Sequence, residues 1–262
     1  MSKRRLDTLL AERGLYESRS RAAAAVMAGD VHVGELPAHK PGQLVAVDAE
    51  LTVADAPAFV SRGGTKLANV LDAFAIDPEG RRALDAGAST GGFTDCLLQR
   101  GAEAVIALDV AYGELHWSLR QDPRVTVIER RNARRLKCDE LPFAPDLIVA
   151  DLSFISLTKV LPTLVACTPS RFDCLALVKP QFEVGRALLS RGGVVREAED
   201  RRAALLRVAR HAREAIGTAV LGFASSGLPG PAGNLESFVW LAEGGREGAT
   251  EDLEAAARKV EP

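Results

Sequence analysis

From residue 81 onward, short apolar runs alternate with stretches in which apolar residues recur every three or four positions. The first pattern is typical of buried β-strands and the second of α-helices. Strands are predicted over 81–89, 104–110, 125–130, 146–154, 173–180, 219–224 and 238–242, and helices over 93–100, 112–121, 156–166 and 199–217. This alternation predicts an α/β domain built on a doubly wound parallel sheet.

The first sixty residues have a different pattern. Three leucines between residues 6 and 10 fall on one helical face, and a second helix is predicted between Ser18, which can cap it, and Gly29, which can end it. Residues 31–53 then alternate and turn like small strands and hairpins. The sequence therefore predicts a small α+β module ahead of the larger α/β domain.

Basic residues concentrate at the start of this module. The first 21 residues hold Lys3, Arg4, Arg5, Arg13, Arg19 and Arg21, against the acids Asp7, Glu12 and Glu17. Arg19 and Arg21 open the second predicted helix, where guanidinium groups and a helix N-terminus can both face phosphates. A solvated basic first turn explains the same charges, so charge alone leaves both interpretations open.

An amphipathic helix is predicted between the two parts. Apolar spacing from Leu67 to Phe74 places its start near Thr65. Lys66 stands in its first turn, where the helix dipole disfavours a cation, so it is either a functional lysine or an ordinary surface lysine. The predicted organisation is a module at 1–60, a linker at 61–64, the larger domain at 65–244 and a polar tail at 245–262.

The composition narrows the class of protein. The chain has 262 residues, is 47% hydrophobic and has a formal net charge of -2, so it is not basic as a whole. Four scattered cysteines without C-x-x-C spacing predict no metal site, and free thiols fit a reducing cytoplasm. No signal core follows the basic N-terminus, and no apolar run approaches the roughly 18 residues of a membrane span. A soluble, cytoplasmic protein is expected.

Four charged residues stand at or near the carboxyl ends of predicted strands: Asp85, Asp109, Asp151 and Lys179. In parallel α/β sheets these ends meet at one edge, and ligands bind there. Their common placement makes all four candidates for a functional site, whereas each one alone is also explained as a strand-end cap or a surface charge.

A glycine-rich loop, "DAGASTGGF" at 85–93, follows the first of these strands. It lacks the middle glycine of the dinucleotide fingerprint, because Ser89 stands there, and the chain has no G-K-[ST] triphosphate loop. Asp109 follows Gly87 by 22 residues and ends the next strand, where a carboxylate can accept from both ribose hydroxyls. An adenosine without a pyrophosphate fits these features, so S-adenosylmethionine is the predicted cofactor.

Longer motifs carry two resemblances. The segment "RLDTLLAERGLYESRSRAAAAVMAGDVHVG" followed by "HKPGQLV" resembles the alpha-L RNA-binding domain of the ribosomal protein S-four type, although Val33-Gly34 replaces the asparagine often seen before the hairpin glycine. The second set of motifs is "VSRGGTKL", "DAGASTGGFTD", "LDVAYGEL", "ERRNAR", "VADLSFISL", "LVKPQFEVG", "RGGVVRE" and "GNLESF". Together these motifs resemble the TlyA (haemolysin A) family of ribosomal RNA 2'-O-methyltransferases.

This resemblance implies a seven-stranded, Rossmann-like class I methyltransferase sheet. It also implies methyl transfer from S-adenosylmethionine to a cytidine 2'-hydroxyl in ribosomal RNA. Either or both ribosomal subunits are candidate substrates, and the sequence implies no particular oligomeric state. The implied catalytic tetrad is Lys66, Asp151, Lys179 and Glu236. The cofactor-binding set is Asp85, Gly87, Ala88, Ser89, Thr90, Gly91, Gly92, Phe93, Asp109, Val110, Asn132 and Asp151. The expected RNA-binding residues are Arg4, Arg5, Ser18, Arg19, Arg21 and Arg62.

A ribose 2'-hydroxyl is a weak acid, so its methylation needs groups that orient it and favour its deprotonation. Lys179 is the predicted proton acceptor, and Asp151 and Lys66 are expected to orient it. Glu183 is the carboxylate closer to Lys179 in sequence. The resemblance favours Glu236 as the fourth member, and Glu183 is either a competing carboxylate or a solvated loop acid.

Three other functions compete with this hypothesis. A nonenzymatic RNA-binding or ribosome-assembly factor would keep the same fold, but the intact loop and tetrad argue against it. A membrane-active haemolysin matches the family label, but the chain has no span or signal, although an amphipathic surface helix remains compatible with it. A nicotinamide oxidoreductase is disfavoured by Ser89 and by the N-terminal module.

Overall fold

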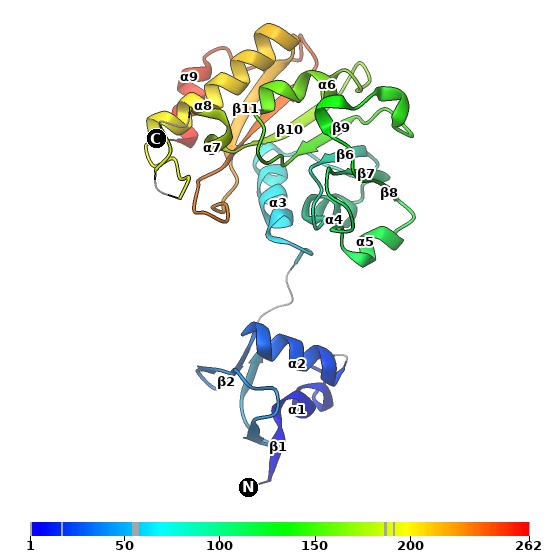
Figure 1. Ribbon diagram of the computed structural model, residues 1–262, viewed down its shortest axis with the longest axis vertical. Helices are drawn as coiled ribbons and strands as arrows, with labels where there is room; N and C mark the ends of the chain where they lie inside the picture. The colour runs from blue at the N-terminus through cyan, green and yellow to red at the C-terminus, as the bar shows by residue number, and fades with distance from the viewer. Residues whose placement is uncertain (1, 17, 54–57, 186–187, 191, 262) are drawn as a thin grey trace. The chain divides into compact units, whose positions relative to one another are not determined.

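The computed structural model describes residues 2–16, 18–53, 58–185, 188–190 and 192–261. Its internal contacts divide the chain into two compact units, Met1–Ala58 and Phe59–Pro262. Figure 1 labels helices and strands of both units where there is room, and the two units are described here one at a time.

The first unit is a small α+β fold. Its elements are β1 (Lys3–Arg5), α1 (Leu6–Glu12), α2 (Arg19–Ala28), β2 (Val31–Val33), β3 (Leu36–Pro37), β4 (Leu44–Ala46) and β5 (Leu51–Val53). Strand β1 pairs antiparallel with β4, and β2 lies between β3 and β5. The Ser18 hydroxyl accepts a hydrogen bond from the Arg21 amide, and α2 ends at a left-handed Gly29. Both predicted ends of this helix are therefore confirmed.

The second unit is built on one seven-stranded sheet. Its strands are β6 (Arg82–Ala86), β7 (Ala104–Leu108), β8 (Val125–Ile128), β9 (Leu147–Ala150), β10 (Asp173–Val178), β11 (Ala219–Ser225) and β12 (Ser237–Ala242), in the spatial order β11-β12-β10-β9-β6-β7-β8. Strand β12 runs antiparallel to both of its neighbours, and the other neighbouring strands pair in parallel. The predicted α/β sheet is confirmed, but it is mixed rather than wholly parallel. A loop joins β11 to β12 where a crossover helix would be needed to keep them parallel.

Helices cover both faces of this sheet (Figure 1). One face packs against α3 (Arg62–Phe74), α4 (Gly92–Gln99) and α5 (Trp117–Gln121), and the other against α6 (Leu161–Val165), α8 (Ala198–His211) and α9 (Leu253–Val260). Shorter turns complete the unit: η1 (Ala133–Arg135), η2 (Cys138–Glu140), η3 (Leu157–Lys159), α7 (Pro180–Glu183) and the π-helical η5 (Ala212–Ile216). The helix predicted over 156–166 is divided into η3 and α6, because Pro162 fits only the first turn of a helix.

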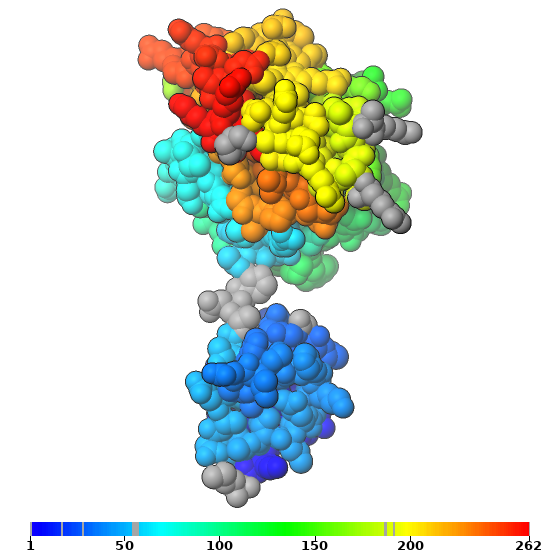
Figure 2. Space-filling view, turned by 90° about the vertical axis from the view of Figure 1, so that its left-hand side faces the viewer, coloured from blue at the N-terminus to red at the C-terminus, as the bar shows by residue number. Residues whose placement is uncertain are grey.

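Two predicted boundaries are wrong. Residues 62–64 of the expected linker form the first turn of α3, where Gly64 leaves room for the Phe59 side chain, which a Cβ atom there would strike. The expected polar tail contains α9, whose Leu253 and Ala257 are buried against the main core. Figure 2 shows this C-terminal segment, in red, lying against the yellow region that contains α8. Packing therefore extends further along the chain than local polarity indicated.

The cysteines also differ from expectation. Cys138 and Cys167 form a disulfide across 29 residues, whereas Cys96 and Cys174 are buried free thiols. The prediction of four free thiols is wrong for the first pair. Their Cα atoms lie 4.9 Å apart in the fold, a proximity that sequence spacing does not reveal.

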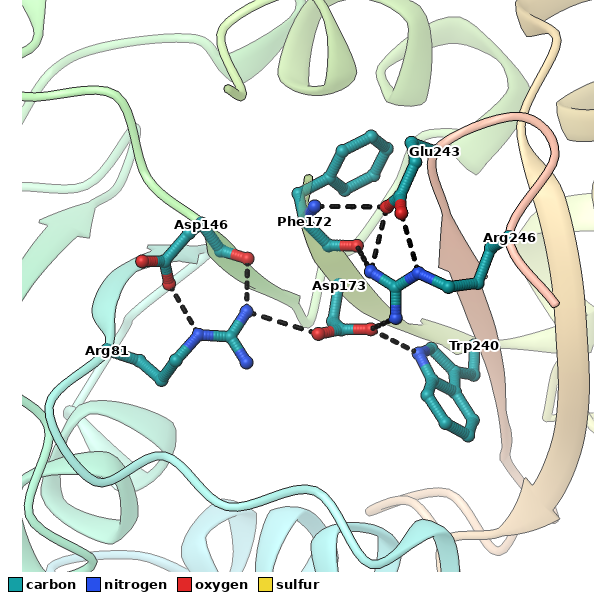
Figure 3. Close-up of polar contacts among 7 residues, drawn as sticks. All are labelled: Arg81, Asp146, Phe172, Asp173, Trp240, Glu243 and Arg246. Atoms are coloured by element: carbon teal, nitrogen blue, oxygen red, sulfur yellow. Dashed lines mark hydrogen bonds and ion pairs between the residues drawn. The ribbon is translucent and has the colours of Figure 1, made fainter. Parts of the chain in front are cut away.

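A polar network lies at the edge of the sheet opposite the glycine loop, where β6 and β10 begin and β12 ends (Figure 3). The Asp173 carboxylate accepts from Trp240 Nε1 at 2.9 Å, Arg81 Nη2 at 3.1 Å and Arg246 Nη1 at 3.3 Å. Arg246 Nε also donates to Glu243 at 2.6 Å. The network ties the beginning of β10 to the end of β12 and to the residue before β6, and so it holds strands that are distant in sequence in register.

Candidate active site

The glycine-rich loop turns sharply between β6 and α4. Gly87, Ser89 and Gly91 all have positive φ angles, of 91°, 46° and 101°. A side chain at Gly87 would strike the backbone oxygen of Asp151, so only glycine fits there. Ser89 tolerates the strained region because its amide donates to Asp109 at 2.8 Å and its hydroxyl donates to Glu114 at 3.2 Å.

Asp85 lies beneath this loop and is fully buried. One carboxylate oxygen accepts from the Thr94 amide at 2.9 Å and from the Thr94 hydroxyl at 2.7 Å, which fixes the first turn of α4. Burial raises the pKa of Asp85 to about 7. Its other oxygen, Oδ1, has no hydrogen-bond partner among the described residues. Asp85 therefore supports the start of α4 through its hydrogen bonds to Thr94. Although it is one of the predicted cofactor-binding residues, it lines neither of the two cavities described next.

The first cavity has the features expected for an adenosine. It measures about 530 Å³ and is lined by Gly87, Ser89, Asp109, Val110, Glu114, Asn132, Ala133, Asp151, Leu152, Ser153, Phe154, Ile155 and Val160. The Asp109 carboxylate is held in place by the amides of Ser89 and Ala111, each at 2.8 Å. A carboxylate fixed in this way suits ribose hydroxyls, and the aliphatic lining suits a purine. The residues present therefore fit S-adenosylmethionine.

The second cavity adjoins the first. It measures about 500 Å³ and is lined by Ser61, Arg62, Gly63, Lys66, Gly87, Ala88, Ser89, Thr90, Gly92, Phe93, Asp151, Lys179, Pro229 and Pro231. Gly87, Ser89 and Asp151 line both cavities. Among the predicted cofactor residues, Ala88, Thr90, Gly92 and Phe93 line only the second cavity, and Gly91 packs beneath Leu115 and Leu119.

The four predicted catalytic residues form two ion pairs. Lys66 of α3 pairs with Glu236, which precedes β12, and Lys179 pairs with Asp151, each of them following a strand. Lys179 Nζ also donates to Ser153 Oγ at 3.1 Å. Lys66, Asp151 and Lys179 line the second cavity, whereas Glu236 lies behind Lys66 and is 2% exposed. Three of the four residues, from separate parts of the chain, thus line one cavity, and Glu236 pairs with one of them.

Glu183 does not belong to these pairs. It is buried, and its carboxylate accepts from Ser156 Oγ at 2.6 Å and from the Leu157 amide at 2.7 Å. Burial raises its pKa. The alternative of a solvated loop acid is therefore excluded, because α7 turns the Glu183 side chain inward against the segment that follows β9.

Several lining residues were absent from the sequence prediction. Ser61, Ser153, Phe154, Pro229 and Pro231 all border one of the cavities. Ser153 and Phe154 follow Asp151 directly, so their place in "VADLSF" was an available signal. Phe154 is 91% exposed at a φ of 63°, and no sequence pattern indicates such a conformation for phenylalanine.

The predicted RNA-binding residues lie in both units. Arg5 and Arg19 pair with the buried Asp7, at 2.8 and 3.0 Å, and their hydrogen bonds lower the pKa of that carboxyl group. Arg4 pairs with Glu12 at 3.3 Å. Arg21 and Ser18 meet at the helix cap described above. Arg62 belongs to the second unit, where it donates to the Pro229 carbonyl at 2.9 Å and lines the second cavity.

The second unit has a seven-stranded sheet with one antiparallel strand, and a glycine-rich loop follows its first strand, β6. These features are typical of the Rossmann-like methyltransferase fold. The chain belongs to the FtsJ-like methyltransferase family, whose family model matches residues 59–243, and an S4 domain model matches residues 4–51. It is 53% identical over 239 residues to the 16S/23S rRNA (cytidine-2'-O)-methyltransferase TlyA of Mycobacterium tuberculosis, covering 90% of this chain and 89% of the relative. The family expected from the sequence motifs is confirmed.

Other relatives carry a different name. Hemolysin A of Brachyspira hyodysenteriae is 40% identical over 197 residues, which cover 74% of this chain and 81% of that protein. A solved structure of a hemolysin-named protein from Streptococcus thermophilus is 36% identical, with a TM-score of 0.74 and coverage of 99% of this chain and 96% of that one. Within the described part of this chain, every helix is too short or too polar to cross a membrane.

Proposed function

We propose that this protein transfers a methyl group from S-adenosylmethionine to the 2'-hydroxyl of a cytidine in ribosomal RNA. The observation that carries the proposal is the place of Asp151, which lines both cavities and pairs with Lys179. The name of the Mycobacterium tuberculosis relative supports the nature of the substrate. The S4 domain match supports RNA as the partner, ribosomal subunits are the proposed form of that partner, and the cytoplasm is the proposed place of action.

The first cavity would hold the cofactor. Asp109 would accept hydrogen bonds from the ribose hydroxyls, and the backbone at Gly87 would allow the ligand to approach the end of β6 closely. When bound, S-adenosylmethionine supplies a methyl group that is already activated by its sulfonium. The protein therefore has to align the acceptor and remove its proton.

Lys179 is the proposed acceptor of that proton. Its Nζ is held by Ser153 Oγ and by Asp151, which lines both cavities, while Lys179 itself lines the second. In the proposed reaction Nζ, in its neutral amine form, takes the proton of the 2'-hydroxyl, and the cationic Lys66, which lines the same cavity, stabilises the negative charge that develops on the oxygen. Glu236 balances the charge of Lys66 in its buried position.

Lys179→Ala tests this assignment. We expect methyl transfer to ribosomal subunits to fall by about 10²-fold or more, because the proton acceptor is lost. Cofactor affinity should stay within about threefold, because Lys179 does not line the first cavity. Tritiated-methyl transfer measures the first quantity and calorimetry the second, with the exposed Lys159→Ala as the matched control.

Near-normal methylation by Lys179→Ala would remove Lys179 from the mechanism. A wild-type protein that binds subunits without methylating them would instead favour the nonenzymatic assembly factor. Mapping 2'-O-methyl groups in ribosomal RNA with and without the protein identifies the modified subunit and nucleotide.

A further inference from the structure

Two segments that leave neighbouring strands are joined along their length. Residues 151–157 follow β9, and residues 179–183 follow β10. Lys179 holds Asp151 and Ser153 at one end of this junction. Further along, the rings of Phe154 and Phe182 lie with their centroids 5.3 Å apart. The two segments therefore form one structural unit that carries the Lys179–Asp151 pair.

Glu183 closes the far end of this unit. Its Oε2 accepts from Ser156 Oγ at 2.6 Å, and its Oε1 accepts from the Leu157 amide at 2.7 Å. Leu157 is the first residue of η3, so this amide is one of the donors that a helix start leaves without an internal partner. The Glu183 side chain is 2% exposed. The carboxylate therefore caps the end of the segment from the interior.

The backbone of Glu183 is fixed as well. Arg207 of α8 donates from Nη1 to the Glu183 carbonyl at 2.8 Å, which ties the residue to a core helix. Glu183 lines neither cavity, so its carboxylate touches neither the cofactor site nor the acceptor site.

The segment that Glu183 caps needs such support. Phe154 adopts a left-handed backbone conformation, which is unfavourable for a bulky side chain and persists only where the surroundings enforce it. Five consecutive residues of the segment, from Asp151 to Ile155, also line the first cavity. A shift of this segment would move Asp151 away from the junction of the two cavities.

We infer that Glu183 is a positioning residue: it holds the segment 151–157 in the conformation that aligns Asp151 and Lys179 for methyl transfer. The kinetic part of this inference rests on the proposed function. The structural part concerns the order of the segment and is measured without any reaction.

The structural part is tested by hydrogen exchange on the full-length protein. In Glu183→Ala we expect the peptide that covers 151–158 to exchange at least about tenfold faster, while peptides from β6 and β7 keep wild-type rates. Ser156→Ala removes one of the two contacts and should give an intermediate increase. Glu243→Gln serves as the matched control, because it weakens a carboxylate network at the opposite edge of the sheet.

Glu183→Gln supplies the conservative rescue. Its amide oxygen can still accept from Leu157, and its amide nitrogen can donate to Ser156 Oγ, whose own proton can turn to Thr158 Oγ1 at 2.7 Å. We expect this variant to keep near-wild-type exchange in 151–158 and most of the methyl-transfer rate. A positioning role needs the hydrogen bonds and not the charge.

The kinetic part uses single-turnover methyl transfer at saturating cofactor. Glu183→Ala should lower the rate constant by about 10- to 100-fold, because small misplacements of reacting groups are costly. The KM for the RNA should change much less. In a Lys179→Ala background the same substitution should cost almost nothing further, since both changes act on one element.

Wild-type exchange in 151–158 of Glu183→Ala would overturn the inference. So would a Glu183→Gln variant as impaired as Glu183→Ala, because the charge itself would then be required. If the wild-type protein transfers no methyl group, the proposed function fails, whereas the exchange experiment still decides whether Glu183 orders the segment.

Discussion

At the scale of single residues, the cofactor cavity depends on how one carboxylate is held. Asp109 accepts from the amides of Ser89 and Ala111, so the glycine loop and the loop after β7 are both tied to it. This contact also explains why a serine replaces the middle glycine of a dinucleotide fingerprint. Ser89 occupies the left-handed region with its amide directed at Asp109.

Asp109→Ala should therefore weaken cofactor binding. The variant loses the acceptor for the ribose hydroxyls and leaves two loop amides without their partner. Losing hydrogen bonds to a charged group costs about 1.5–3 kcal/mol, so calorimetry should show a dissociation constant about 10- to 100-fold higher. Asp122→Ala is a suitable control, because that carboxylate pairs with Arg124 and lines neither cavity. Unchanged affinity in Asp109→Ala would show that the adenosine binds elsewhere.

At the scale of elements, the two ends of the parallel strands carry different kinds of residues. The carboxyl ends of β6, β7, β9 and β10 carry the glycine loop, Asp109, Asp151 and Lys179. The opposite edge holds the Asp173 network, whose charged groups pair with one another (Figure 3).

Glu243 gives this network a pH dependence. Its hydrogen bond with Arg246 lowers the pKa of Glu243 from 4.5 to about 2. A carboxyl group whose pKa is lower in the folded protein stabilises the fold at any pH above its pKa in the unfolded chain. For Glu243 this contribution is lost as the pH falls from about 4.5 towards 2. Glu243→Gln should thus lower the melting temperature at pH 7 by a few degrees, about 2–4 °C per kcal/mol lost.

Below pH 4.5 the difference in melting temperature between wild type and Glu243→Gln should shrink, because Glu243 takes up a proton in the unfolded chain while the folded carboxyl stays ionised until about pH 2. Calorimetric melting between pH 7 and pH 3 measures this difference, and the exposed Glu247→Gln is the control. A difference that stays constant with pH would mean that the charge of Glu243 does not support the network.

At the scale of the whole molecule, the chain consists of two units with separate cores. Leu6, Leu10 and Val26 lie in the core of the first unit, whereas both cavities and all four tetrad residues belong to the second. Phe59 and Val60 pack with the second unit, and the Val60 amide donates to Asp95 at 2.7 Å. A cut before Phe59 therefore leaves the second core intact.

The fragment 59–262 should keep cofactor binding and lose RNA affinity. Cofactor affinity should stay within about threefold of the full-length value, while affinity for ribosomal subunits falls by at least about tenfold. The affinity of the fragment should also depend less steeply on salt, because fewer phosphate contacts release counterions. Filter binding across a salt series measures both effects. Equal RNA affinity with and without the first unit would assign RNA binding to the second unit alone.

Local sequence determined much of this protein. Apolar periodicity placed the strands and most helices, because burial of alternate faces follows directly from the helix and strand repeats. Ser18 and Gly29 marked the ends of α2, since capping depends on neighbouring residues alone. The motifs also identified the family, and the strand-end positions of Asp85, Asp109, Asp151 and Lys179 indicated one edge of the sheet as the site.

Only the tertiary structure decided which groups meet. Lys66 and Glu236 are 170 residues apart, and their pairing depends on α3 packing against β12, where Phe74 contacts Trp240. The Cys138–Cys167 bond and the burial of α9 are likewise long-range contacts that local pattern does not encode. Glu183 is a further example of a contact that the sequence did not reveal. It lies four residues after Lys179, but its carboxylate turns inward and accepts hydrogen bonds from Ser156 and Leu157. Sequence spacing sets local geometry, whereas burial and pairing are properties of the assembled core.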